Sequence, residues 1–580
     1  HYNTPLREIM THSLFLSKKL ITIASLIGLA NTVWAENLTK EIPKKQEKTS
    51  IEAPIAKAKA RPLISKIKEK IEQESSKGLK LPVVEKTLDN GLKIILLERK
   101  ESPVVACRLF YTTGSVHEVP GQAGLAHYLE HMLFKGTAKV GVKDLDKDTY
   151  YLAKTDSLYA IWEEAKNSQN LSLQKEIRAE MDSVMKEHGK YLTPDELWQA
   201  YQAAGGTGLN AFTSDLMTAY FVTLPANKVE LFFWLEADRM ENAIFREFMP
   251  ERDVVREERR MRYDDSPYGR YFESLIATFY EEHPYRIPTI GWPSDIENLS
   301  KAQITEHYQK YYKPNNAILV LAGNFDSPKT LKQIERYFGN IKRGEDHAIL
   351  TIKEPTQVGA KRLTQYKADA KPRYDLLFQA PEVGQKDAYA LEVLAGILSG
   401  QGGRLYRRLV EKEGLALGTD AGLRAQKYIS SFEIDVNYKP NLKLEEVNQV
   451  EEIIWQEIQK IQNEGVSEKE LMKVRNQAVA ASVRAFEGLE HAANQLAFNE
   501  LYGSWKLVQD WPIEIAKITA ADVKRVANTY LKYHLSTTGQ MLEPGQKPAW
   551  QSEGNPTVKD EAPELKRLYK AKKKQVKGDK

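Results

Sequence analysis

Residues 127–131 carry the residue types needed for metal-assisted hydrolysis. They read His-Tyr-Leu-Glu-His, so His127 and His131 are four residues apart and Glu130 stands between them. On a helix, positions i and i+4 share a face, so both imidazoles can bind one metal ion while Glu130 holds a water molecule. This set is typical of a hydrolytic zinc site, although histidines that only pack in an amphipathic helix would give the same pattern.

The flanking residues favour the metal-binding interpretation. Residues 124–126 (Gly-Leu-Ala) precede the motif, and residues 132–137 (Met-Leu-Phe-Lys-Gly-Thr) follow it. This pattern predicts a buried apolar helix closed by glycine. Burying two histidines and a glutamate together is unfavourable unless something pairs them, and a metal ion would do so.

A zinc site needs a third protein ligand, and the best acidic candidates lie in residues 251–258. Glu251 and Glu258 are seven residues apart, which is two helical turns on one face, whereas Glu257 points elsewhere. An exposed helix with Arg–Glu pairs would have the same composition. These residues by themselves leave open which carboxylate binds the metal.

An internal repeat relates two halves of the chain at an offset of 219 residues, which takes Trp292-Pro293 to Trp511-Pro512. Other matched pairs are Ile296 and Ile515, Ala302 and Ala521, Tyr311 and Tyr530, and Lys313 and Lys532. The same offset pairs Glu258 with Gln477, and the second half has no His-x-x-Glu-His motif. The repeat predicts two related α+β halves, of which only the first can hold the metal.

The pattern of apolar residues predicts the elements around the motif. Residues 83–88 and 92–97 read as a β-hairpin, and residues 104–112 read as a strand with Cys107 as a buried thiol. Residues 143–200 read as a helical hairpin inserted into the first half. We therefore expect a catalytic domain at 81–345, a connection at 346–360 and an inactive homologous domain at 361–545.

The ends of the chain have a different character. In residues 1–35, Lys18-Lys19, an apolar run at 20–30 and Val33-Trp34-Ala35 predict a signal peptide cleaved after Ala35. A membrane anchor is the alternative, but the apolar run is short for a span. Residues 36–80 are expected to be a charged flexible linker, and residues 546–580 a basic disordered tail. These features predict export to a periplasm without a stable membrane anchor.

Composition excludes several classes of protein. The 580 residues carry a formal net charge of +4, which argues against nucleic-acid binding. A single cysteine excludes a disulfide within the chain and a cysteine-based metal cluster.

Taken together, the sequence resembles the pitrilysin/insulinase family of zinc metallopeptidases, the inverzincins, which include mitochondrial processing peptidase. The resemblance covers residues 81–545. It rests on the motif with its flanks and on Gly114-Ser115, Glu118, residues 210–214 (Asn-Ala-Phe-Thr-Ser), residues 251–258, His283-Pro284-Tyr285, Ile290-Gly291-Trp292 and residues 402–406 (Gly-Gly-Arg-Leu-Tyr).

The resemblance implies a role for each matched residue. One Zn²⁺ per chain would be bound by His127, His131 and Glu258, with Glu130 as the general base. Glu251 would orient a zinc-binding histidine from outside the coordination sphere. Asn210 and Ala211 would lie on an edge strand that pairs with an extended peptide substrate.

The resemblance also implies a fold and an assembly. The fold would be α+β, with two homologous α/β-sandwich domains, each an antiparallel sheet with helices on one face. Together they would form half of a clamshell chamber, completed in a homodimer or in a heterodimer with a related two-domain subunit. The family's substrate-binding Arg and Tyr could not be located in this sequence. The number of residues between His131 and Glu258 in the sequence is larger than is usual in the family. The 143–200 insertion accounts for most of the difference.

The expected function is therefore that of a zinc-dependent endopeptidase, which hydrolyses short or unfolded peptides through a metal-activated water. One alternative is a non-catalytic peptide-binding or scaffold subunit of a processing-peptidase-like complex. Such subunits usually lose the motif that is intact here. A zinc hydrolase acting on other substrates is a second alternative, which the expected edge strand at Asn210-Ala211 disfavours.

Overall fold

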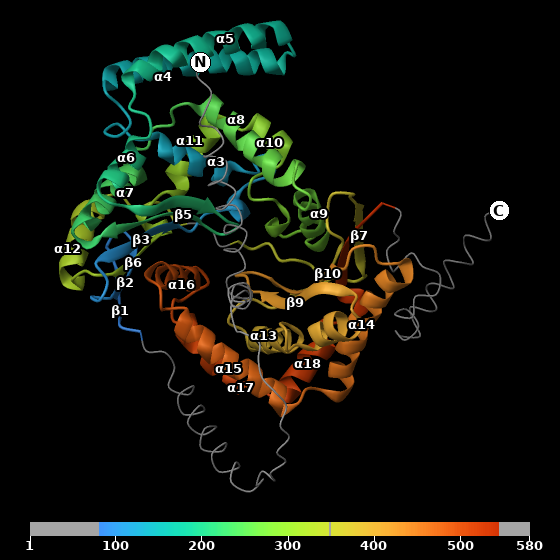
Figure 1. The fold of residues 1–580 in the computed structure, drawn as a ribbon. Helices are drawn as coiled ribbons and strands as arrows, with labels where there is room; N and C mark the ends of the chain where they lie inside the picture. Colours follow the sequence, from blue (N-terminus) through green and yellow to red (C-terminus); the bar gives the residue numbers. More distant parts are fainter. Residues whose placement is uncertain (1–80, 347–349, 545–580) are drawn as a thin grey trace, which may run out of the picture.

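The computed structural model describes residues 81–346 and 350–544 (Figure 1). The expected signal peptide, the linker at 36–80 and the basic tail at 546–580 lie outside the described residues. Within the described ranges, no helix combines the length and the apolar character needed to cross a membrane.

The first half is built on a six-stranded sheet with the order β1-β2-β6-β3-β5-β4. Its strands are β1 (Val83–Thr87), β2 (Lys93–Glu98), β3 (Val104–Tyr111), β4 (Thr207–Thr213), β5 (Thr218–Pro225) and β6 (Ala317–Gly323). β1 and β2 form the expected hairpin, and Cys107 is buried on β3. The strands pair in antiparallel fashion as the sequence predicted, except β2 and β6, which are parallel and make the sheet mixed. Parallel neighbours need a long crossover, and here nearly the whole first half lies between the two strands.

The second half repeats this arrangement in a five-stranded sheet with the order β7-β11-β8-β10-β9. Its strands are β7 (Lys361–Tyr366), β8 (Arg373–Ala380), β9 (Ala416–Arg424), β10 (Ser430–Tyr438) and β11 (Ser536–Leu542). β7 and β11 form the one parallel pair among them. The order matches that of β2 to β4 in the first sheet, so the two halves share one topology with β1 as an addition.

The repeat is visible in the bounds of the elements themselves. The helix α11 (Lys301–Tyr311) corresponds to α18 (Ala520–Tyr530), and β6 corresponds to β11, at the same offset of residue numbers. Both helices begin with a capping box, formed by Ser300 with Gln303 and by Thr519 with Asp522. Because the side chains of a capping box satisfy backbone N–H groups at the helix start, the same local chemistry sets both boundaries.

Helices and a long hairpin complete the first half. The helices that accompany the first sheet are α3 (Leu125–Met132), α6 (Glu196–Ala203), α7 (Val229–Asn242), α8 (Phe248–Arg259), α10 (Pro293–Asn298), α11 and α12 (Ser327–Phe338). The insertion forms α4 (Leu145–Asn167) and α5 (Leu171–His188), which pack side by side and extend from the body of the half (Figure 1). In the second half the helices are α13 (Lys386–Leu398), α14 (Leu444–Glu464), α15 (Glu468–Arg484), α17 (Leu507–Lys517) and α18.

The two halves exchange helices across their sheets. α9 (Gly269–Phe279) belongs to the first half but packs on β7 and β11, whereas α16 (Leu489–Leu501) belongs to the second half and packs on β2, β3 and β6 (Figure 1). Phe110 and Phe498 meet at this junction with their ring centroids 6.0 Å apart. Each sheet is therefore covered on both faces, where the sequence predicted helices on one, and a shared apolar core joins the halves.

Candidate metal and catalytic site

The helix α3 carries the motif and starts at a backbone position that requires glycine. Gly124 has φ 93°, and a Cβ there would lie 2.5 Å from the carbonyl oxygen of Ile290. The Glu118 carboxylate accepts hydrogen bonds from the N–H groups of Gly124 (2.9 Å) and Ala126 (2.8 Å). A carboxylate at this end satisfies free N–H groups and interacts favourably with the helix dipole, so Glu118 fixes where α3 begins.

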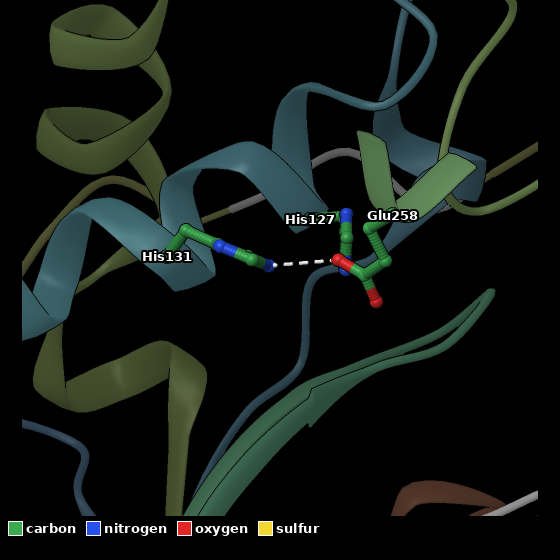
Figure 2. A group of neighbouring side chains, drawn as sticks. All are labelled: His127, His131 and Glu258. Carbon is green, nitrogen blue, oxygen red and sulfur yellow. Dashed lines mark ion pairs between the residues drawn. The ribbon is translucent and has the colours of Figure 1, made fainter. Parts of the chain in front are cut away.

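Three side chains from α3 and α8 converge beside this helix (Figure 2). Glu258 Oε2 lies 3.6 Å from His127 Nε2 and 3.2 Å from His131 Nε2. One ligand atom from each of the three residues falls within 4.8 Å of the others, and among the described residues this is the one His, Cys, Asp or Glu group with that geometry. The structure thus brings Glu258, and not Glu251, to the face shared by both Nε2 atoms.

Glu251 lies on the other side of the His131 ring. The Nδ1–H of His131 donates to Glu251 Oε1 over 2.7 Å, and Lys135 Nζ lies 2.7 Å from Glu251 Oε2. Burial would raise the pKa of Glu251, but His131 and Lys135 outweigh burial and lower this pKa to about 2. The ionised carboxylate therefore holds the proton of His131 on Nδ1 and leaves Nε2 to face Glu258.

The two imidazoles differ in their electrostatics. Burial lowers the pKa of His127 to about 3, so this ring is neutral at pH 7. Burial also acts to lower the pKa of His131, but its hydrogen bonds to Glu251 and Glu258 outweigh that effect and raise it to about 10. For Glu258, burial is likewise outweighed by His131, His127 and Arg262, and its pKa falls to about 2. An anionic carboxylate between two ring nitrogens is a site that favours a cation.

The donor set fits zinc. A catalytic zinc site commonly has three protein ligands and one open position, and two imidazole nitrogens with one carboxylate oxygen are such a set. Here the cavity leaves the fourth position open. His127 Nδ1 is buried without a hydrogen-bond partner in the described part of the chain. A neutral ring whose Nε2 points at the anionic Glu258 is suited to share a cation with it.

Glu130 projects from the same face of α3 and is held by the edge strand. Thr213 Oγ1 on β4 donates a hydrogen bond of 2.6 Å to Glu130 Oε2. Burial raises the pKa of Glu130 to about 7, against the opposing effects of His131 and Thr213. A carboxyl group that titrates near neutral pH can both accept and release a proton, which is the requirement for a general base that later acts as an acid.

A cavity of about 640 Å³ opens over these residues. Its lining includes the three convergent side chains, Glu130, and the strand residues 210–213. Asn210 and Ala211 pair with Phe221 and Tyr220 of β5, and β4 is the last strand of its sheet. Among the strands of the described residues, none lies on the other side of β4, and an extended peptide could pair there beside Glu130.

In the part of the second half that the structure describes, no equivalent metal-binding group is present. Gln477, which the repeat pairs with Glu258, is exposed on α15. The helix α13 packs on α15 as α3 packs on α8, but α13 contains no histidine.

Sequence reasoning assigned no role to two residues that contact the site. Thr213 holds Glu130, and Arg262 donates to Glu258 Oε1, with its Nη2 at 2.8 Å. The position of Arg262, four residues after Glu258 on a helix, was a signal that could have identified this pair. Thr213 gave no such signal, because its role depends on how β4 packs against α3.

Comparisons with known proteins agree with this architecture. Residues 93–149 match the family described as "Insulinase (Peptidase family M16)", and residues 298–478 match the "Peptidase M16 inactive domain". A relative from Helicobacter pylori, named "Zinc protease PqqE", is 28% identical over 460 residues, which are 78% of this chain and 91% of the relative.

Solved structures show the same fold. A protease from Helicobacter pylori is 27% identical with a TM-score of 0.65, and the match covers 80% of this chain and 100% of that one. The periplasmic protease PqqL from Escherichia coli is 18% identical with a TM-score of 0.61, and the match covers 80% of this chain and 48% of that one. The two matched segments and the two-sheet fold are those of the M16 class of peptidases. This chain belongs to that insulinase family, and it has relatives that are named zinc proteases.

Proposed function

We propose that this chain is a zinc-dependent endopeptidase that hydrolyses short or unfolded peptides. One observation supports the proposal most strongly. The metal-binding group of His127, His131 and Glu258, the buried Glu130 carboxyl group and the open edge of β4 all line the same cavity. His127, His131 and Glu258 would hold one Zn²⁺ per chain. The membership in a peptidase family and the relative named as a zinc protease support this assignment.

The chain's own residues supply most of the mechanism. When bound, zinc would polarise the scissile carbonyl and lower the pKa of a water molecule. The backbone around Asn210 and Ala211 would hold an extended peptide by strand pairing, which selects unfolded chains. Glu130, oriented by Thr213, would take a proton from the attacking water and pass it to the leaving amine. Glu251 would keep His131 in the tautomer that presents Nε2.

We further propose that the chain acts after export to a periplasm and that a second two-domain unit completes its chamber, in a homodimer or heterodimer. The periplasmic location of the Escherichia coli relative supports the first point. The match to about half of that relative's length supports the second. Measurement of the solution mass of the purified protein tests the assembly, and a fully active monomer would contradict it.

Metal content and peptide cleavage, measured on the same preparation, test the proposed function. Glu258→Gln should lower zinc content and cleavage together, since an amide is a much poorer ligand than a carboxylate. Glu257→Gln is the matched control, because Glu257 is exposed on the same helix and pairs with Arg260. Full zinc occupancy in Glu258→Gln would show that the third ligand lies elsewhere.

A further inference from the structure

The segment that follows the inserted hairpin forms part of the wall of the cavity. Gly189 and residues 192–198 line it together with the site residues. This segment connects the end of α5 to the first turn of α6. The 143–200 insertion therefore reaches the site directly instead of only projecting from the surface.

Trp198 is the apolar feature of this wall. Its side chain is 40% exposed, and among the exposed large apolar side chains of the described residues it is the one that lines the cavity. The neighbouring wall residues Leu192 and Leu197 are buried. No other aromatic ring packs on Trp198 within the described ranges. An exposed indole surface in a cavity favours binding of an apolar group that removes it from water.

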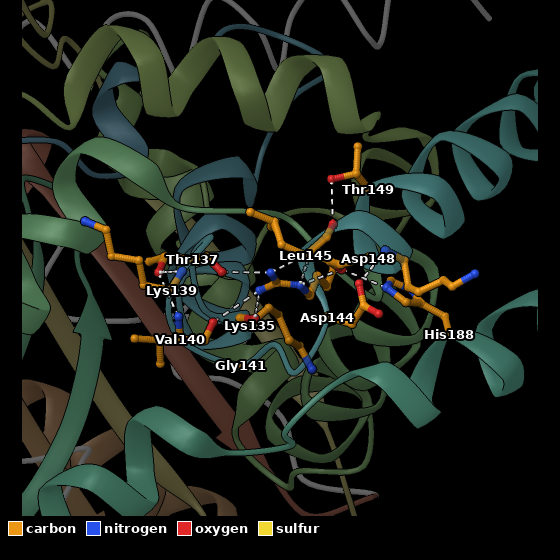
Figure 3. Close-up of polar contacts among 12 residues, drawn as sticks. Lys135, Thr137, Lys139, Val140, Gly141, Asp144, Leu145, Asp148, Thr149 and His188 are labelled. Carbon is orange, nitrogen blue, oxygen red and sulfur yellow. Dashed lines mark hydrogen bonds and ion pairs between the residues drawn. The ribbon is translucent and has the colours of Figure 1, made fainter.

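A buried ionic cluster anchors the start of the insertion beside the site (Figure 3). Asp148 on α4 accepts from Arg246 Nη2 and pairs with His188 Nε2 on α5, both at 2.7 Å. Arg246 also donates to the carbonyl oxygens of Lys135 (2.9 Å) and Thr137 (2.7 Å), which follow the motif helix. The hairpin and the end of the motif region are thereby joined through one guanidinium.

The wall itself is fixed to the same region. The N–H of Thr193 donates to the carbonyl oxygen of Gly141 over 3.1 Å, and the Glu196 carboxylate accepts from the N–H of Gly141. Val142 and Leu192 form an antiparallel bridge. The segment that carries Trp198 is thus fixed by its bonds to Gly141 and Val142. Less conformational entropy is therefore lost when a ligand binds to it.

We propose that Trp198 is a specificity-determining residue, whose indole binds an aromatic side chain of a peptide lying in the cavity. The inference rests on the proposed peptide-hydrolysing function. It adds that the insertion supplies the surface that selects one side chain of the substrate.

Binding of paired peptides tests this inference. The two unstructured peptides of a pair are identical except at one position, which is Phe in one and Ser in the other. Successive pairs place this position at different points along the peptide. Binding is measured by fluorescence anisotropy on protein carrying Glu130→Gln, so that cleavage does not interfere. At one position Phe should improve binding about tenfold over Ser. Trp198→Ala should reduce this ratio to near one, and Trp198→Phe should retain most of it.

Trp234→Ala is the matched control, because Trp234 is 39% exposed on α7 and does not line the cavity. It should keep the ratio of the parent protein. A ratio unchanged by Trp198→Ala, or reduced equally by Trp234→Ala, would overturn the inference. If the parent shows the Trp198-dependent preference but wild-type protein cleaves neither peptide, the endopeptidase proposal fails and the aromatic-binding inference stands. If the wild-type protein cleaves both peptides but no position shows a preference for Phe over Ser, the endopeptidase proposal stands and the aromatic-binding inference fails.

Discussion

Glu251 and His131 form a 2.7 Å hydrogen bond that fixes which nitrogen of the His131 ring faces Glu258. The carboxylate accepts a hydrogen bond from the Nδ1–H group, so Nε2 is the nitrogen directed at Glu258. Glu251 and Glu258, both on α8, thus contact opposite nitrogens of one imidazole. Substitutions of Glu251 and Glu258 should therefore have different effects on zinc binding.

Glu251→Gln should weaken zinc binding about 10- to 100-fold without abolishing it, because the partner that orients His131 is lost while the proposed ligands remain. Zinc affinity measured by competition with a chelator checks this. The control is Glu247→Gln, since Glu247 contacts Lys135 at 3.0 Å but is not bonded to the histidines. Equal zinc affinity in Glu251→Gln and the wild type would contradict the proposed role.

The sequence predicted the motif helix well, because its information is local. The spacing of His127, Glu130 and His131 sets one helical face, and the glycines on either side set its ends. The repeat predicted the correspondence of α11 with α18 for the same reason, since each copy carries its own capping residues.

Other features depend on contacts that no local pattern encodes. The parallel pairing of β2 with β6 and the contact of Phe110 with Phe498 join residues far apart in the chain. The choice between Glu251 and Glu258 could not be made from their spacing, because both lie on one helix face. Only the position of α8 against α3 separates them, by placing Glu258 at the Nε2 atoms.

Asp148→Asn should destabilise the fold by about 3–5 kcal/mol, because it removes the charge that pairs the buried Arg246. The Asp148 side chain is 0% exposed, and that of Arg246 is 2% exposed. Urea unfolding followed by circular dichroism measures the change in the free energy of unfolding.

The control for this substitution lies on the same helix. Asp156 pairs with Lys301 at 2.7 Å, but its side chain is 50% exposed. Asp156→Asn should therefore cost at most about 1 kcal/mol. Equal effects of the two substitutions would contradict the account of the buried cluster.

Glu392 should make the stability of the chain depend on pH. Burial raises its pKa from 4.5 to about 7, although Trp511 Nε1–H, at 2.7 Å, acts to lower it. The folded state therefore holds the proton more tightly than the unfolded state. This contribution is present in full below pH 4.5 and is lost as the pH rises through 7.

Glu392→Gln should remove this loss, because the amide oxygen can still accept from Trp511. The full shift corresponds to about 3 kcal/mol, and we expect about 2 kcal/mol because Glu392 keeps some solvent exposure. The test compares the free energies of unfolding of wild type and variant at pH 5 and pH 8. The variant should gain relative to the wild type at pH 8, and a constant difference between them would refute the prediction.

The central claim is that Glu130 is the general base of a zinc peptidase, and Glu130→Gln tests it most directly. Zinc content and the rate of cleavage of an unstructured peptide are measured on one preparation of each protein. We predict the same zinc content as in the wild type, and a rate lower by about 10²- to 10⁴-fold, because the ligands remain and the proton acceptor is lost. An unchanged rate in the zinc-loaded variant would contradict the account.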